Sequence, residues 1–332
     1  MSKSLNKPDN RVRELAKTSA YVLLYLCLIN SNVYAQTSSS SPARVKNIAI
    51  TIDDLPLNGP SIGLNRLRKM TRSFLAPIRS QRIPVVGFVN ESQLYANGET
   101  DDRIAILADW VSAGAELANH TYSHVGFKDT PLNIFQDEFV RGDTVIKHLM
   151  KNKGRTVRFF RHPFLQMAPT REIEASFEQF ISDRGYRIAP TTVDSMDWMF
   201  LFAYARAKQK GDKELMGRVS HDYLTLVNQR LEYAERLADE MFGRPISHIL
   251  LFHSNELTAA NFDELLDVIR KRGYRFATLE ETLKDEIYRD PPKYAPTSDW
   301  LSLWSFNVGK PNHPPPPPDY IRQAFDEAQQ GK

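Results

Sequence analysis

Short apolar runs recur along the chain from residue 45 onward, with polar, turn-forming residues between them. Runs of this length are typical of buried β-strands. The pattern predicts strands at 45–52, 83–89, 116–119, 157–160, 186–189, 246–252 and 274–277. Because amphipathic stretches separate these runs, we expect strands and helices to alternate, as in an α/β protein with a parallel sheet or barrel.

The stretches between the predicted strands carry apolar residues at intervals of three and four positions, as amphipathic helices do. They predict helices at 63–79, 102–114, 133–151 and 170–184. Several end near a glycine, a frequent helix stop: Gly114, Gly154, Gly185 and Gly273. A longer helical excursion, at 199–211 and 218–242, is expected either to pack outside the barrel or to cover its cleft.

The first 35 residues have the three parts of an export signal. Five basic residues precede an apolar core at 20–29, and Val33–Ala35 offers a small-residue cleavage site. Ten apolar residues are too few to span a bilayer as a stable helix. We therefore expect a signal peptide at 1–35, no stable membrane span after its cleavage, and export to the periplasm or the exterior.

Cys27, the only cysteine, lies inside this segment, so the expected mature chain has neither disulfides nor cysteine metal ligands. Removing residues 1–35 takes away five basic and two acidic side chains, which leaves 38 of each. This neutral balance, without a basic block, argues against nucleic-acid binding. The length suits one large α/β barrel or two small domains.

The two ends of the predicted globular part differ in composition. Residues 36–44 are expected to form a polar linker. Residues 289–332 are rich in proline, which is typical of a stiff tail, with a short helix expected from Asp319.

Two histidines four residues apart, His120 and His124, follow the predicted strand at 116–119. Asp53 and Asp54 end the first predicted strand. In a (β/α) barrel the carboxyl ends of the strands share one face, where functional side chains collect. Two imidazoles and a carboxylate form a ligand set for a divalent metal, and a second carboxylate beside it could handle protons. The alternative is that the two aspartates cap a turn or helix.

Three further strand ends carry reactive side chains. Arg161 could orient a carboxylate through a two-point contact, whereas the neighbouring His162 is interpreted as simply exposed. Asp197 and Trp198, taken alone, fit a surface turn with a packed indole. His253 ends a strongly apolar strand, so it is the best candidate for a proton donor whose pKa a carboxylate such as Asp197 would raise.

Taken in order, five short motifs resemble those of the polysaccharide deacetylase family, which is carbohydrate esterase family 4 or the NodB homology domain. The motifs are Thr51-Ile-Asp-Asp54, His120-Thr-Tyr-Ser-His124, Arg161-His-Pro-Phe164, Asp194-Ser-Met-Asp197-Trp198 and Leu251-Phe-His253. The resemblance covers about residues 45–285 and implies a catalytic domain at 45–288 with a distorted (β/α) barrel of about seven strands. The reaction it implies is metal-dependent removal of N-acetyl, or sometimes O-acetyl, groups from a polysaccharide.

The resemblance also implies roles for the matching residues. Asp54, His120 and His124 match the metal ligands, with zinc as the expected ion and cobalt, nickel and manganese as alternatives. Asp53 matches the catalytic base, and Arg161 matches the arginine that orients it.

The backbone N–H of Phe164 matches an oxyanion contact of the family. Asp197 and His253 match the pair that supplies the general acid. Trp198 and Leu251 match residues that wall the groove and receive the acetyl methyl group.

Two departures from the family pattern bear on the substrate. Leu55-Pro56-Leu57 stands where a glycine usually follows the Asp pair, so we expect a bulkier rim near the metal. Phe164 replaces a frequent tyrosine, which removes a hydroxyl but not the backbone N–H.

The leading hypothesis is therefore an exported hydrolase that deacetylates an amino-sugar polymer such as peptidoglycan, a chitin-like oligomer or an exopolysaccharide. Two alternatives are an esterase or amidase that acts on another acyl substrate, and a non-catalytic carbohydrate-binding module. The sequence leaves the oligomeric state open.

Overall fold

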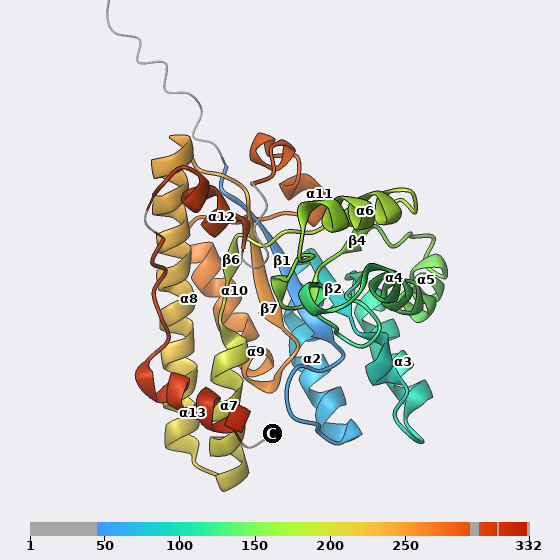
Figure 1. Cartoon of the computed structure of the whole chain (residues 1–332). Helices are drawn as coiled ribbons and strands as arrows, with labels where there is room; N and C mark the ends of the chain where they lie inside the picture. The colour runs from blue at the N-terminus through green and yellow to red at the C-terminus, as the bar shows by residue number, and fades with distance from the viewer. Residues whose placement is uncertain (1–44, 293–298, 311, 331–332) are drawn as a thin grey trace, which may run out of the picture. The chain divides into compact units, whose positions relative to one another are not determined.

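The computed structural model describes residues 45–292, 299–310 and 312–330 (Figure 1). The predicted signal peptide and linker, at 1–35 and 36–44, lie outside the described residues. Within the described ranges, no helix is both long enough and apolar enough to cross a membrane.

A parallel sheet of eight strands forms the centre of the fold. The strands are β1 (Asn47–Leu55), β2 (Val85–Val89), β3 (Glu116–Asn119), β4 (Phe159–Phe160), β5 (Arg187–Ile188), β6 (Val193–Asp194), β7 (His248–His253) and β8 (Arg275–Phe276). Seven of them follow the order β5-β4-β3-β2-β1-β7-β6, and β8 pairs with the first two residues of β1. Taken as a ring, this is the strand order of a (β/α) barrel that is open between β5 and β6. The predicted distorted barrel is confirmed.

The strand that the pattern did not predict is β6. It has only two residues, Val193 and Asp194, which pair with Leu250 and Leu251 of β7. The strand lies in the polar stretch Thr191-Thr-Val-Asp-Ser195, which contains no apolar run to recognise. It forms because the edge of β7 offers backbone partners to the segment beside it.

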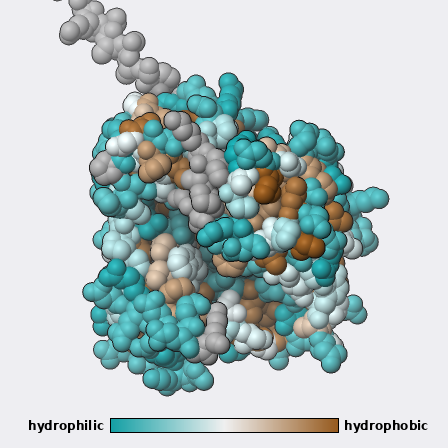
Figure 2. Space-filling model, viewed as in Figure 1, coloured by the Kyte–Doolittle hydropathy of each residue, from teal (hydrophilic) through white to brown (hydrophobic). Residues whose placement is uncertain are grey.

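Helices cover the outside of the sheet (Figure 1). The longer ones between the strands are α2 (Leu64–Gln81), α3 (Thr100–Ser112), α4 (Leu132–Arg141), α5 (Thr144–Lys151), α6 (Arg171–Ser182), α7 (Asp197–Lys210), α8 (Lys213–Phe242) and α10 (Phe262–Lys271). Their buried faces are apolar and pack into the core. In α2, for example, Leu67 and Phe74 are fully buried, and each such side chain contributes about 1.5–3 kcal/mol relative to an exposed one. The outer side of α8 is mostly hydrophilic (Figure 2).

The single helix predicted at 133–151 is wrong, because two helices, α4 and α5, occupy it. They are separated at Gly142, which lies against the backbone of Thr121. The next residue, Asp143, accepts a hydrogen bond of 3.0 Å from the Nδ2 of Asn119. The break therefore lets the loop after β3 approach the helices closely, a tertiary requirement that helical periodicity does not reveal.

The described part of the proline-rich segment packs on the same compact unit. It contains α12 (Trp300–Asn307), which was not predicted, and α13 (Asp319–Gln330), which was. Trp304 and Ile321 are buried in the main core. The Nη1 of Arg230, on α8, donates to the carbonyl of Pro315 at 3.0 Å, and α13 lies across α7 (Figure 1). This segment is thus part of the domain's helical layer.

Candidate active site

Two aspartates near the end of β1, just before Leu55, both enter one site. Asp54 has a left-handed backbone (φ 60°), so its side chain does not alternate with that of Asp53 as it would in a continuing strand. Both carboxylates approach the Nε2 of His120. The Oδ2 of Asp53 lies 3.7 Å from this atom, and the Oδ1 of Asp54 lies 3.5 Å from it. Both carboxylates are buried.

Asp54, His120 and His124 bring their side chains together at the carboxyl ends of β1 and β3. One ligand atom from each lies within 4.8 Å of the others. The Oδ1 of Asp54 is 3.2 Å from the Nε2 of His124. Because metal–ligand bonds are about 2 Å long, one ion can reach atoms that are spaced in this way. The structure thus brings together the three residues that the sequence predicts as metal ligands.

The neighbours of these residues leave the required atoms free. The Nδ1 of His120 lies 2.9 Å from the carbonyl oxygen of Arg161, so Nδ1 carries the proton and Nε2 is a free lone pair. The Oδ2 of Asp54 accepts a hydrogen bond of 2.6 Å from Asn58, whereas its buried Oδ1 has no hydrogen-bond partner among the described residues. A buried carboxylate oxygen without a donor is costly. The donor set and this orphaned oxygen fit a divalent cation.

The protonation states also suit a metal. Burial, aided by His124, lowers the pKa of His120 to about 3. Burial likewise lowers the pKa of His124. For Asp54, burial alone would raise the pKa, but His124 and His120 outweigh it and hold the pKa below its usual value. At neutral pH the set is one carboxylate and two neutral imidazoles, which is the state that metal binding requires.

Arg161 holds Asp53 in place from inside the barrel. Its guanidinium is buried, and its Nη1 donates to the Oδ1 of Asp53 at 2.7 Å and to the Oγ1 of Thr51 at 2.8 Å. Its Nε and Nη2 donate to the carbonyl oxygens of Ala189 and Pro190 at 3.1 and 3.2 Å. These two carbonyls belong to the link between β5 and β6, so Arg161 also spans the opening of the barrel.

Asp53 has the electrostatics of a general base. Burial raises its pKa to about 6, although Arg161 and His253 oppose the rise. A carboxylate with this pKa is ionised at neutral pH and still binds a proton more readily than an exposed aspartate.

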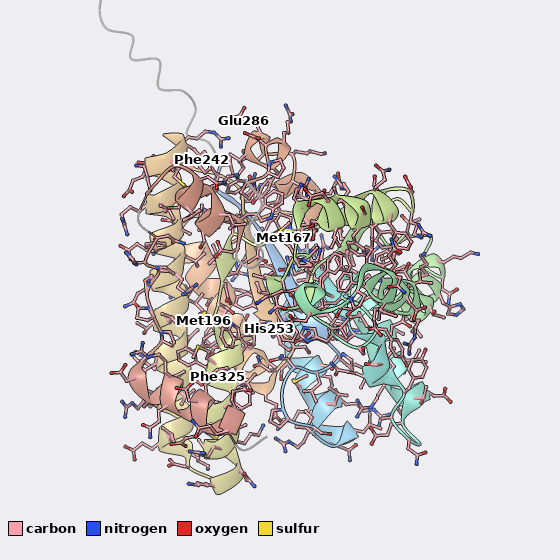
Figure 3. The ribbon with its side chains drawn as sticks, in the orientation of Figure 1. Met167, Met196, Phe242, His253, Glu286 and Phe325 are labelled. Atoms are coloured by element: carbon pink, nitrogen blue, oxygen red, sulfur yellow. The ribbon has the colours of Figure 1, made fainter. Side chains whose placement is uncertain are left out.

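His253 and Asp197 form a tight pair on the other side of the site. The Nδ1 of His253 lies 2.7 Å from the Oδ1 of Asp197, which is fully buried. The Oδ2 of Asp197 accepts hydrogen bonds from the backbone N–H of His253 (2.7 Å), the hydroxyl of Thr258 (2.6 Å) and the amide of Asn255 (3.1 Å). Burial would lower the pKa of His253, but Asp197 outweighs it and raises this pKa to about 10. Figure 3 shows His253 at the end of β7.

The remaining predicted residues surround these groups. Phe164 is 58% exposed, and its ring lies 4.3 Å from that of His124. Its N–H belongs to the first turn of a 3₁₀ helix, η4 (Pro163–Leu165), where N–H groups lack intrahelical partners. The indole of Trp198 donates to Asp194 at 3.2 Å and contacts Phe325 of α13, and Leu251 is buried in β7. The roles of these three toward a substrate stay predictions.

One expectation near the site is wrong, and a second fails for one of its three residues. His162 is not exposed, because only 5% of it is accessible. Leu55 does not add bulk to the rim. It is fully buried and turned toward β2, where its Cδ1 occupies the space beside Gly87. A Cβ at position 87 would stand 2.2 Å from this Cδ1, so a larger residue there would force the Leu55 side chain to move.

The sequence reasoning missed several residues that orient the reactive ones. Asn58 bonds Asp54, and Asn255 and Thr258 bond Asp197. Glu138 accepts hydrogen bonds from the N–H and hydroxyl of Ser123, at 2.7 and 2.8 Å, inside the loop between the two histidines. A signal existed for the two asparagines, since each is a polar residue a few positions after a strand end that already carries a candidate residue.

Solved structures with a similar fold include members of carbohydrate esterase family 4. One is an esterase from Streptomyces lividans in complex with acetate (19% identity, TM-score 0.46, 71% of this chain and 95% of the other covered). Another is an acetyl xylan esterase from Clostridium thermocellum with a cobalt ion (19%, TM-score 0.45, 72% and 90%). A third is a pseudoenzyme from Bacillus anthracis (16%, TM-score 0.48, 73% and 66%). The comparison with curated proteins gives no match.

The family comparison bears directly on the site. The model that matches is described as "Polysaccharide deacetylase", and it covers residues 40–187. This stretch contains the aspartate pair, both histidines of the metal cluster and Arg161, whereas Asp197 and His253 lie beyond it. The geometry joins both parts into one site. Residues 40–187 of the chain are thus similar to the polysaccharide deacetylase family.

Proposed function

We propose that this protein is an exported, metal-dependent deacetylase that hydrolyses acetamide groups on an amino-sugar polysaccharide or oligosaccharide. One observation carries the proposal. Asp54, His120 and His124 converge with a free buried oxygen between them, while Asp53 lies beside the cluster at 3.7 Å from the Nε2 of His120. This arrangement provides a metal site and a separate base, which acyl hydrolysis needs.

A bound divalent ion supplies Lewis-acid chemistry, because it acidifies water and polarises an acetyl carbonyl. Asp53, fixed by Arg161 at 2.7 Å, accepts the proton of the attacking water. The N–H of Phe164 donates to the carbonyl oxygen as negative charge develops there. His253, kept protonated by Asp197 at 2.7 Å, donates a proton to the departing amine. The products are acetate and a free amino sugar.

Zinc is the ion that we propose, because two imidazoles and one carboxylate with open positions are a common zinc donor set in hydrolases. The expected glycans are peptidoglycan, a chitin-like polymer or an exopolysaccharide. Export to the periplasm or the exterior is supported by the basic, apolar and small-residue pattern of residues 1–35.

The test is an acetate-release assay on N-acetylated chito-oligomers, peptidoglycan and O-acetylated xylan, with metal analysis of the same protein. We expect acetate from at least one N-acetylated glycan, loss of release with a chelator, and recovery when zinc is added back. Release from xylan alone would favour the esterase alternative. Binding to a glycan without acetate release from any of them would contradict the proposal.

A further inference from the structure

The turn between Arg161 and α6 has an unfavourable backbone. Phe164 and Leu165, two consecutive residues with side chains, both have positive φ values, 58° and 53°. In this left-handed region the Cβ crowds the following carbonyl, so residues other than glycine seldom occupy it. Such a conformation persists only when the surrounding structure holds it in place. The Phe164 N–H, proposed above as an oxyanion donor, lies within this strained turn.

One buried carboxylate contacts both ends of this turn. Glu174, on α6, is fully buried. Its Oε1 lies 3.1 Å from the Nε2 of His162, at the start of the turn. Its Oε2 accepts a hydrogen bond of 2.8 Å from the backbone N–H of Ala168, at the end of the turn. Met167, labelled in Figure 3, marks this end of the turn.

Four aromatic rings surround His162 and hold it in place. Its ring is nearly parallel to those of Phe127 and Phe135, at 12° to each. It meets Phe160 and Phe177 at centroid distances of 5.0 and 5.8 Å. This aromatic box leaves His162 little freedom to move away from Glu174.

The charge state of Glu174 suits a permanent contact. Burial would raise its pKa, but His162 and the Ala168 N–H outweigh burial and hold the pKa below its usual value. A buried, ionised carboxylate keeps a hydrogen-bond donor such as the Ala168 N–H strongly, because leaving the charge unpaired is expensive.

We propose that Glu174 is a positioning residue: through His162 and Ala168 it holds the strained turn so that the Phe164 N–H faces the acetyl carbonyl. This inference rests on the proposed deacetylase function. On its exposed side the ring of Phe164 lies 4.3 Å from that of His124, and Phe164 and Gln166 lie beside Gly126. The buried contacts on the inner side of the turn come from Glu174.

The experiment compares Glu174→Gln with Glu178→Gln in the metal-loaded protein. Glu178 lies one helical turn further along α6, is partly exposed, and pairs with Arg171 at 2.8 Å. We expect Glu174→Gln to lower kcat per bound metal about tenfold, with KM unchanged within about twofold, because a displaced oxyanion donor weakens transition-state binding alone. Glu178→Gln should match the wild type in both constants. Rates come from acetate release on an N-acetylated chito-oligomer.

A second readout does not depend on activity. Amide hydrogen exchange of the peptide spanning residues 162–168 should become faster in Glu174→Gln and stay unchanged in Glu178→Gln. If Glu174→Gln does not fold, His162→Phe replaces it, since a phenyl ring fits the aromatic box and lacks the Nε2 contact. Wild-type exchange or wild-type kcat in the folded variant overturns the inference. Faster exchange in a protein whose wild type releases no acetate would overturn the proposed function and support the role of Glu174 in holding the turn.

Discussion

Gly142 packs so closely on Thr121 that a Cβ at position 142 would stand 2.8 Å from the carbonyl carbon of Thr121. Thr121 directly follows His120, within the loop that carries both predicted histidine ligands. The contact is with backbone, so no side-chain rotation can relieve it. The break between α4 and α5 therefore helps to position the loop that carries two of the three candidate metal ligands.

We expect Gly142→Ala to weaken metal binding at least about tenfold. The added Cβ would push the loop with His120 and His124 by several tenths of an ångström, and metal–ligand bonds tolerate little displacement of their ligands. The measurement is a competitive zinc titration against a chromophoric chelator. Gly217→Ala is the matched control, since a Cβ there, within α8, meets nothing within 4 Å. Equal zinc affinity in Gly142→Ala and the wild type would contradict this account of the loop.

Gly87 and Leu55 share one space between β1 and β2, where a Cβ on Gly87 would stand 2.2 Å from the Cδ1 of Leu55. We expect Gly87→Ala to lower the free energy of unfolding by about 1–3 kcal/mol through overpacking. In the Leu55→Ala background, Gly87→Ala should cost little, because the side chain that it would overlap has been shortened. The double variant should therefore have a higher free energy of unfolding than the sum of the two single effects predicts. Urea unfolding of the four proteins measures this coupling, and strict additivity would refute it.

Asp197 should set the basic limit of activity. It raises the pKa of His253, which must be protonated to donate to the leaving group. In Asp197→Asn this pKa falls, so we expect the basic limb of the kcat profile to move to lower pH and turnover at neutral pH to drop. Profiles of kcat against pH for the two proteins provide the check. An unmoved basic limb would mean that His253 is not the acid.

His248 gives a pH dependence of stability that is separate from the active site. It is buried at the start of β7, and burial lowers its pKa to about 4. In the unfolded chain its pKa is about 6.5, so the unfolded state binds the extra proton between these values. Stability is thus fully present above pH 6.5 and is lost as the pH falls toward 4, by up to about 3 kcal/mol. His248→Gln should show a shallower decline in urea unfolding between pH 7.5 and 5, and an identical decline would disprove the assignment.

Much of the fold could be predicted from the sequence because most strands, including the two-residue strands β4, β5 and β8, lie in longer apolar runs. The convergence of the aspartate pair with His120 and His124 followed from one rule, that parallel strands present their carboxyl ends on one face. The two-residue strand β6, at Val193–Asp194, gave no pattern to recognise.

The features that were missed depend on contacts between distant segments. The helix break at Gly142 depends on the close approach of the Thr121 backbone, and the burial of Leu55 depends on the space beside Gly87. His162 is buried because Glu174 and an aromatic box, which lie elsewhere in the chain, receive it. Periodicity describes one segment at a time, so it cannot specify such pairs.

The central claim is that Asp54 binds the metal and Asp53, its neighbour, does not. Metal content per chain, measured by elemental analysis of Asp53→Asn and Asp54→Asn after loading with zinc and desalting, tests it most directly. We predict about one ion per chain in Asp53→Asn, as in the wild type, and almost none in Asp54→Asn, since a site of this type needs three protein ligands. Full occupancy in Asp54→Asn, or an empty site in Asp53→Asn, would contradict the claim.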